Sequence, residues 1–179
     1  MNEYVTELTK AMKYLADDSR TIFMGQAVAV AGTIMSPTLV DVPAEKRIEL
    51  PVAEDMQMGM SLGWALNGFV PVSIFPRWNF MLLATGQLVN HLDKIKEMSR
   101  GGYQPRVIIR TGVGATKPLN PQCQHLGDFT EAIRLMLTNT EVIRLDKVED
   151  IMPAYTKALH REDGKSTIVV EWGDKYHDL

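Results

Sequence analysis

Residues 47–80, RIELPVAEDMQMGMSLGWALNGFVPVSIFPRWNF, limit what this chain can fold into more than any other stretch. Residues 48–50 alternate in polarity and lead to Pro51, whose ring cannot donate a ladder hydrogen bond, so a short strand should end there. The nearly all-apolar run 56–66 has the length of a helix, which we expect to be buried on all sides. Residues 70–75 follow as a second apolar strand. A strand, a helix and a strand at this spacing predict the crossover unit of a parallel sheet.

The rest of the chain continues this alternation. Apolar periodicity predicts further helices at residues 2–16, 79–100, 126–137 and 149–160, and further strands at residues 21–24, 107–109, 142–145 and 167–171. Glycine and proline in residues 26–46 indicate a loop with a short helix. Because 45% of the 179 residues are apolar, the chain can bury a core. We therefore predict one α/β domain over residues 1–179, in three layers: a mostly parallel six-stranded sheet with helices on both faces.

In open sheets of this kind the ligand lies outside the carboxyl ends of the strands. Four pieces of the chain should reach that edge, namely Gly25 with Gln26, Glu54 at the start of a helix, residues 76–80, and the loop 112–125. The loop is rich in glycine and proline and is long enough to suggest a functional role. The sequence therefore predicts the site at this edge.

Each candidate side chain also has a simpler structural explanation. Glu54 lies in a first helical turn, where the helix dipole favours an acid without any function. Trp78 and Phe80 are aromatic residues that could serve the core or an interface. His125 lies in a polar loop, where it suits either a general acid or base or a plain solvated residue. The residues alone leave these alternatives open.

Composition excludes several classes of function. The net charge of −3, with interspersed signs, argues against nucleic acid or an anionic membrane as a partner. No apolar run is long enough to span a bilayer, and the start of the chain lacks the apolar centre of a signal peptide, so we expect a cytoplasmic protein. The single cysteine, Cys123, excludes an internal disulfide.

Motifs of other chemistries are missing. The sequence has no GxSxG elbow, no GxxxxGK[ST] phosphate loop and no GxGxxG turn. The histidines lack the spacing of metal ligands, so no metal site is expected. Cys123 with His125 carries no signature of a nucleophile and its base. Asp174 and His177 near the end are expected to form a solvated tail.

Residues 51–72, PVAEDMQMGMSLGWALNGFVPV, resemble the pyrimidine-binding domain of thiamine-diphosphate-dependent enzymes. This family includes transketolase-like enzymes and the beta subunit of the 2-oxo-acid dehydrogenase decarboxylating component. The resemblance continues, in the family's order, through FMGQAV, FPRWNF, GQLVNHLDKI and MSRGGYQPRVIIRTGVGA. It implies the thiamine-diphosphate-binding fold for most of the chain.

The resemblance also implies roles for single residues. Glu54 matches the glutamate that hydrogen-bonds a pyrimidine ring nitrogen and so activates the cofactor for loss of the thiazolium proton. A carboxyl group beside an apolar ring suits this task, because partial desolvation favours its protonated state. Phe80 matches the aromatic residue that packs on the pyrimidine, with Trp78 beside it, and His125 matches a histidine of the substrate pocket. Gln26 stands near the cofactor, where the family usually has an acidic pair after the first strand.

Two features that the family needs are absent from this sequence. It has no GDG motif, which in the family belongs to the domain that holds the diphosphate and Mg²⁺, and it ends where a further C-terminal domain of the transketolase type would begin. The resemblance therefore implies a partner, a diphosphate-binding alpha-like subunit carrying GDG. The assembly would be a homodimer or a two-plus-two hetero-oligomer.

The sequence thus predicts the pyrimidine-binding subunit of a split thiamine-diphosphate-dependent enzyme. It would cleave or decarboxylate a small-molecule substrate, a 2-oxo acid or a ketose, and transfer the resulting unit. The alternative is a non-catalytic family member that acts as a scaffold or regulator of a partner subunit. The donor and acceptor, and the choice between decarboxylase, dehydrogenase and ketol transfer, stay open.

Overall fold

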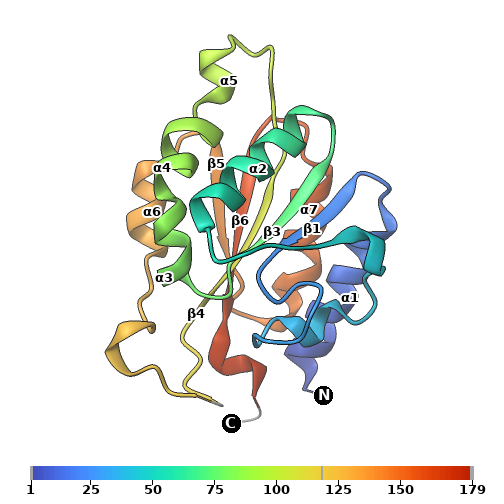
Figure 1. The fold of residues 1–179 in the computed structure, drawn as a ribbon, viewed down its shortest axis with the longest axis vertical. Coiled ribbons are helices and arrows are strands. Elements are labelled where there is room, and N and C mark those ends of the chain that lie inside the picture. Colours follow the sequence, from blue (N-terminus) through green and yellow to red (C-terminus); the bar gives the residue numbers. More distant parts are fainter. Residues whose placement is uncertain (1, 118, 178–179) are drawn as a thin grey trace.

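Six parallel strands form the centre of the structure, a computed structural model that describes residues 2–117 and 119–177. The strands are β1 (Thr21–Gly25), β2 (Arg47–Glu49), β3 (Val70–Ile74), β4 (Ile108–Val113), β5 (Thr140–Arg144) and β6 (Ser166–Trp172). Their order in the sheet is β2-β1-β3-β4-β6-β5, and each adjacent pair is parallel. The predicted sheet is confirmed, and all of its strands point towards the end of the molecule that carries both termini (Figure 1).

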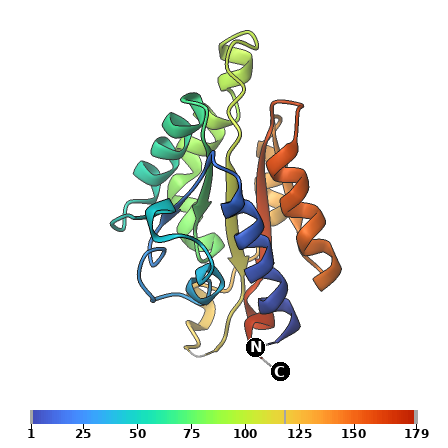
Figure 2. The same cartoon turned by 90° about the vertical axis from the view of Figure 1, so that its right-hand side faces the viewer.

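Helices cover both faces of the sheet (Figure 2). One face carries α1 (Glu3–Asp17) and α7 (Ile151–His160). The other face carries α2 (Glu54–Leu66), α3 (Trp78–Met81), η3 (Leu82–Ala84), α4 (Thr85–Gln87), η4 (Leu88–Leu92) and α6 (Thr130–Met136). α5 (Ile95–Met98) projects beyond the end of the sheet (Figure 1). Shorter turns of helix are η1 (Ser36–Leu39), η2 (Ala44–Lys46), η5 (Gln122–Gln124), η6 (Val148–Asp150) and η7 (Gly173–Tyr176). Each face buries its own apolar core, so the predicted three-layer α/β architecture is correct.

The helix predicted over residues 79–100 is not continuous. It is divided into the short segments from α3 to α5, and its middle segment η4 is a π-helix. Its first turn begins at Trp78, and the Asn79 side chain donates to the carbonyl of Gln124 at 3.1 Å. The irregular turns let buried Asp93 accept hydrogen bonds from the amides of Thr138 and Asn139. The predicted apolar stripe is buried at Met81, Ala84, Leu88 and Leu92.

Three further expectations are corrected by tertiary contacts. α2 is not buried on all sides, because no described residue covers its outer face, where Met56 is 42% exposed. β4 continues to Val113 because it pairs with β6 over its whole length. α6 begins at Thr130, not at residue 126, because the Asp128 carboxylate accepts the Thr130 amide at 2.9 Å.

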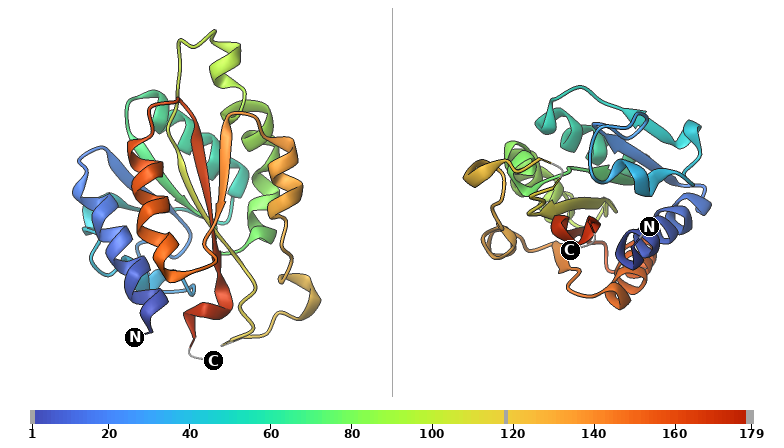
Figure 3. Two further views of the ribbon diagram at one scale, coloured as in Figure 1. Left: turned by 180° about the vertical axis from the view of Figure 1, so that it is seen from behind. Right: turned by 90° about the horizontal axis from the view of Figure 1, so that it is seen from below.

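Residues 173–177, expected to form a solvated tail, are ordered against the domain, although Asp174 itself is exposed. η7 packs beneath the sheet edge, where Tyr176 is buried and Asp174 accepts the Thr116 amide at 2.8 Å. The Asn2 side chain donates to the carbonyl of Lys175 at 2.9 Å, so the two ends of the described chain meet at the carboxyl edge (Figure 3). In the described part of the chain, no helix combines the length and apolarity needed to cross a membrane.

A buried ion pair joins two central strands on the face covered by α1 and α7. Arg110 Nε of β4 donates to Glu171 Oε1 of β6 at 2.6 Å, and both side chains are fully buried. The hydroxyls of Tyr155 and Tyr176 donate to the same carboxylate. Burial and the Glu171 charge hold the pKa of Tyr155 well above its ordinary value, so this phenol remains a donor. The carboxylate is thus satisfied from three sides.

Glu49 anchors the loop that follows β1. Its carboxylate accepts the backbone amides of Ala27, Val28 and Ala29 at 2.6, 2.9 and 2.8 Å. Burial by itself would raise the pKa of Glu49, but these amide hydrogen bonds outweigh it and lower the pKa below the ordinary value. The ionised carboxylate therefore holds the backbone next to Gln26.

The buried pair gives the first prediction. Glu171→Gln should lower the free energy of unfolding by about 3–5 kcal/mol, because it leaves the Arg110 charge buried without a counter-charge. Glu7→Gln breaks the solvent-exposed pair with Lys10 and should cost less than about 1 kcal/mol. Denaturant unfolding measures the free energy of unfolding of both variants. Equal losses would show that the buried pair contributes no more to stability than the exposed pair.

Glu49 gives a prediction about pH. Because folding lowers its pKa, its contribution to stability is present above the ordinary pKa of 4.5 and is lost as the pH falls through the folded-state value. Glu49→Gln should therefore destabilise the protein at pH 7, and the difference from the unmodified protein should shrink below pH 4.5. Thermal unfolding across this range checks it, and a difference that is independent of pH would contradict the role of the charge.

Candidate functional site

The carboxyl ends of β1 and β3 lie side by side with the start of α2, and a narrow crevice, too small to hold a water molecule, lies between them. The crevice is lined by Gln26, Glu54, Gln57, Ile74, Phe75, Pro76 and Phe80. A cavity of about 1060 Å³ borders it and shares Gln26, Pro76 and Phe80 with it. The structure therefore brings together three of the predicted residues, Gln26, Glu54 and Phe80, at the predicted edge.

Glu54 is the first residue of α2 and is only 7% exposed. Within residues 2–117 and 119–177, no group forms a hydrogen bond or an ion pair with its carboxylate. The helix dipole stabilises an acid at this place by about 0.3–1 kcal/mol. The carboxylate oxygens of Glu54 are not among the buried polar atoms, so they keep access to the crevice, which the side chain lines. The carboxylate is therefore placed to meet a group that comes from outside the chain.

The close packing around Glu54 depends on Gln57, which the sequence analysis did not single out, and on Gly25, which it placed at this edge. Gln57, in the same turn of α2, donates from Nε2 to Ser73 Oγ and to the carbonyl of Ile74, both at 3.0 Å. Gly25 lies beneath it, with a φ of +149°. A Cβ at Gly25 would lie 2.5 Å from the carbonyl oxygen of Ile74, so no other residue fits there. Together they fix the first turn of α2 against the ends of two strands.

Phe80 forms one wall of the crevice and also contacts His125. The centroids of the two rings are 5.1 Å apart and their planes are inclined by 47°. His125 lines neither the crevice nor the cavity, and its Nδ1 is buried without a partner among the described residues. The predicted histidine therefore lies behind Phe80, one aromatic ring away from Glu54.

Trp78 does not lie in the crevice. Its side chain is fully buried in the core beneath α2, where it packs with Met58, Phe75 and Met81. The prediction that it contacts the cofactor is therefore corrected to a supporting role, since it fills the space under the segment that carries Phe80. Sequence could not separate the two aromatic residues, because both are apolar and lie within one turn of helix.

Arg77 is a further residue that the sequence analysis missed. It lines the cavity and donates hydrogen bonds to backbone carbonyls of the loop that carries His125. Burial lowers the pKa of its guanidinium, and the nearby Asp174 carboxylate opposes this effect. No described carboxylate lies within ion-pair distance, so carbonyl dipoles satisfy its charge.

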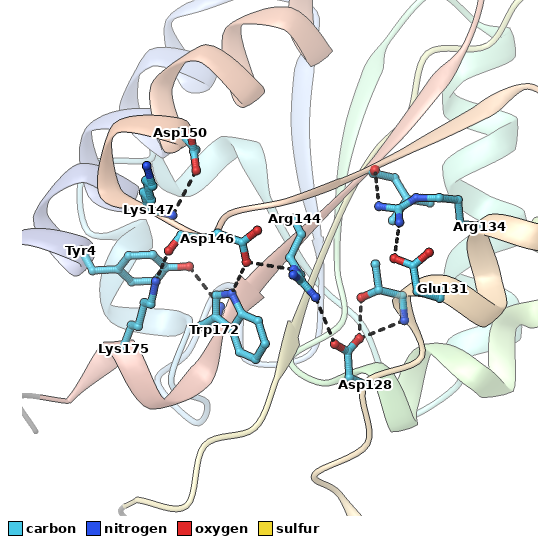
Figure 4. Close-up of polar contacts among 12 residues, drawn as sticks. Tyr4, Asp128, Glu131, Arg134, Arg144, Asp146, Lys147, Asp150, Trp172 and Lys175 are labelled. Atoms are coloured by element: carbon cyan, nitrogen blue, oxygen red, sulfur yellow. Dashed lines mark hydrogen bonds and ion pairs between the residues drawn. The ribbon is translucent and has the colours of Figure 1, made fainter.

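The far end of this loop is held by a second polar cluster, at the ends of β5 and β6 (Figure 4). Arg144 lies 2.8 Å from Asp146 and 3.6 Å from Asp128, which accepts the amide of Thr130 at the start of α6. Trp172 Nε1 donates to Asp146 at 3.1 Å. The cluster therefore fixes where the loop passes into α6.

The donor groups at the edge suit an organic ligand better than a metal ion. In the described residues, no three His, Cys, Asp or Glu side chains are grouped closely enough to hold a metal ion. The crevice instead presents one carboxylate, two amide side chains and an aromatic wall. Such a set can hydrogen-bond and stack a flat heterocycle.

Comparisons with known proteins agree with this arrangement, although no protein-family model matches the chain. The chain is 32% identical over 136 residues to the 3-methyl-2-oxobutanoate dehydrogenase subunit beta of Mycobacterium tuberculosis. The aligned region covers 72% of this chain and 37% of the relative. The chain is 24% identical over 153 residues to the pyruvate dehydrogenase E1 component subunit beta of Mycoplasma genitalium, covering 83% of this chain and 46% of the relative. The chain thus spans less than half the length of these relatives.

A solved structure shows the same fold. It is described as a split gene transketolase, inactive beta4 tetramer, and it superposes with a TM-score of 0.72 at 14% identity. The match covers 94% of this chain and 51% of that one. The chain is therefore a homologue of the beta subunits of 2-oxo-acid dehydrogenases, matching part of their length, and it has a transketolase-like fold.

Proposed function

We propose that this chain is the pyrimidine-binding subunit of a split thiamine-diphosphate-dependent enzyme. The enzyme cleaves or decarboxylates a 2-oxo acid or a ketose and transfers the resulting unit. The observation that carries the proposal is the place of Glu54, which is only 7% exposed, has no hydrogen-bond or ion-pair partner among the described residues and lines a crevice together with Phe80. Homology to 2-oxo-acid dehydrogenase beta subunits supports the same reading.

The residues present fit the pyrimidine half of the cofactor. Glu54 would share a proton with a ring nitrogen, Phe80 would pack on the ring, and Gln26 would line the opposite side. When bound, thiamine diphosphate supplies the nucleophilic carbon for the reaction. The protein's task at this place is to hold the ring and to keep a proton at the Glu54 carboxyl group, in a position closed to bulk water. His125, behind Phe80, would bind substrate or assist proton transfer.

The residues do not provide for the other half of the cofactor. The sequence contains no glycine-rich phosphate loop, and Mg²⁺ requires several oxygen ligands that the described residues do not group together. We therefore assign the diphosphate and Mg²⁺ to a separate alpha-like subunit that carries a GDG motif. In this proposal residues 1–179 form one pyrimidine-binding domain, and catalysis requires the partner.

An exposed apolar surface is available for such an assembly. On α2 and the segments beside it, Met56, Leu66, Phe69, Leu82 and Leu83 are exposed. A shallow groove of about 420 Å³ lies between Met60, Trp64 and Phe69, and nothing lies within 4 Å of a Cβ built at Gly63. Exposed apolar patches of this kind mark interfaces. We propose that this surface joins subunits in a homodimer or in a two-plus-two assembly.

Replacing Glu54 tests the proposal. Glu54→Gln keeps the shape of the side chain but cannot share a proton in the same way, so turnover by the chain with a GDG-carrying subunit should fall by about 10²-fold or more. The free energy of unfolding should be nearly unchanged, because no described group bonds the carboxylate that is replaced. Proton–deuterium exchange at the thiazolium carbon measures the activation directly.

The neighbouring acid provides a matched control. Asp55 lies in the same first turn of α2 but is exposed, so Asp55→Asn should leave exchange and turnover unchanged. Wild-type exchange in Glu54→Gln would refute the assignment of Glu54. An assembled pair that binds the cofactor without any turnover would instead favour the scaffold or regulator.

The split site makes a prediction about binding. The isolated chain should bind thiamine diphosphate more weakly than micromolar, because it lacks the groups that attract the diphosphate and its metal. Calorimetric titration with cofactor and Mg²⁺, with and without the GDG-carrying subunit, measures the difference. Micromolar binding by the isolated chain, worth about 8 kcal/mol, would overturn the assignment of half a site to each subunit.

A further inference from the structure

One guanidinium joins the two ends of the loop that carries His125. Arg77 Nη1 donates to the carbonyl of Gly114 at 2.8 Å and to the carbonyl of His125 at 2.9 Å. Its Nη2 donates to the carbonyl of Ala115 at 3.0 Å. The chain leaves β4 at residues 114 and 115 and returns at residue 125, so Arg77 closes the loop at its base.

The start of the loop has an unusual backbone that needs this support. Gly114 and Ala115 both have positive φ, +79° and +71°, which is uncommon for an alanine. Ala115 is fully buried, and Gly173 lies so close that a Cβ there would be 2.7 Å from the Ala115 Cβ. Asp174 accepts the amide of the next residue, Thr116. The turn is thus held by Arg77 through its carbonyls and by η7 on its other side.

The end of the loop is held by the same segment that forms the crevice wall. Asn79 donates to the carbonyl of Gln124 at 3.1 Å, and Phe80 contacts the His125 ring. Residues 77–80 therefore present Phe80 to the crevice and fix the backbone of residues 124–125 at the same time. The position of His125 depends on main-chain contacts that Arg77 and Asn79 supply.

We propose that Arg77 is a positioning residue that clamps the loop 114–125 and so holds His125 against Phe80. The role of His125 in turnover rests on the function proposed above, whereas the clamp rests on the contacts of Arg77. A lysine cannot replace the clamp, because its ammonium group is a single point, whereas the guanidinium is a planar fork with donors on separate nitrogens. Arg77→Lys therefore keeps the charge and loses the bridge.

The single cysteine permits a direct measurement of the clamp in the full chain. Cys123 is exposed and lies in η5, close to His125, so a nitroxide label can be attached there without further substitutions. Electron paramagnetic resonance should show a more mobile label in Arg77→Lys than in the unmodified chain. Asn79→Ala, which removes only the contact to Gln124, should give a smaller increase.

Arg106 provides the matched control. It is also half-buried, burial lowers the pKa of its guanidinium, and it donates to a single carbonyl, that of Leu159, at 2.7 Å. It lies before β4, at the opposite end of the sheet from the loop. Arg106→Lys should leave the label unchanged. An unchanged label in Arg77→Lys as well would overturn the clamp.

Turnover shows whether the clamp acts through His125. In the reconstituted pair, Arg77→Lys should lower kcat by about 10-fold to 10²-fold, since a displaced group near the reaction centre loses catalysis. The double variant with His125→Ala should be no slower than His125→Ala alone. If the double variant instead lost kcat by the product of the two single losses, the proposal that Arg77 acts through His125 would be overturned. If the unmodified pair shows no turnover, the proposed function fails, while the label still decides whether Arg77 clamps the loop.

Discussion

Parallel pairing of the strands determines where everything else in this molecule can lie. Because the sheet is parallel throughout, every strand ends at the same edge, and the register sets Gly25 beside Ile74 and Glu49 beside Gly25. The backbones approach so closely that only glycine fits at Gly25. The chain leaving β1, the chain leaving β3 and the first turn of α2 then meet around Glu54. The crevice follows from the sheet itself.

Charged groups at this edge divide into those that hold the backbone and one that does not. Glu49 binds three amides of the loop after β1, Asp174 binds the amide of Thr116, and Arg77 binds three carbonyls. Each is satisfied by main-chain groups, and each fixes a loop. Glu54 is buried without such a partner in the described chain. Its carboxylate is therefore a charged group at this edge that remains available to a ligand or another subunit.

The distribution of polar groups also explains why this fold would work as half of a site. The edge offers hydrogen-bonding and stacking groups for a flat ring. Of the arginine and lysine side chains that line the cavity, Arg77 is occupied by loop carbonyls, whereas Lys117 is exposed. A diphosphate with its metal would need charge and oxygen ligands from elsewhere. The exposed apolar surface along α2 shows that this chain has a further face to cover. Both features are consistent with a chain that spans less than half the length of its relatives.

The sequence by itself determined the order of helices and strands, the parallel sheet and the place of Glu54 at a strand end, because these depend on local periodicity and on turn residues. Tertiary structure alone decided that Trp78 enters the core while Phe80 faces the crevice, since both are aromatic and only their neighbours separate them. It also decided that Arg77 and Asp174 hold the loop of His125. Their partners are backbone groups far away in the chain, and backbone carbonyls and amides are the same in every residue. The pattern of side chains in the sequence therefore cannot predict such contacts.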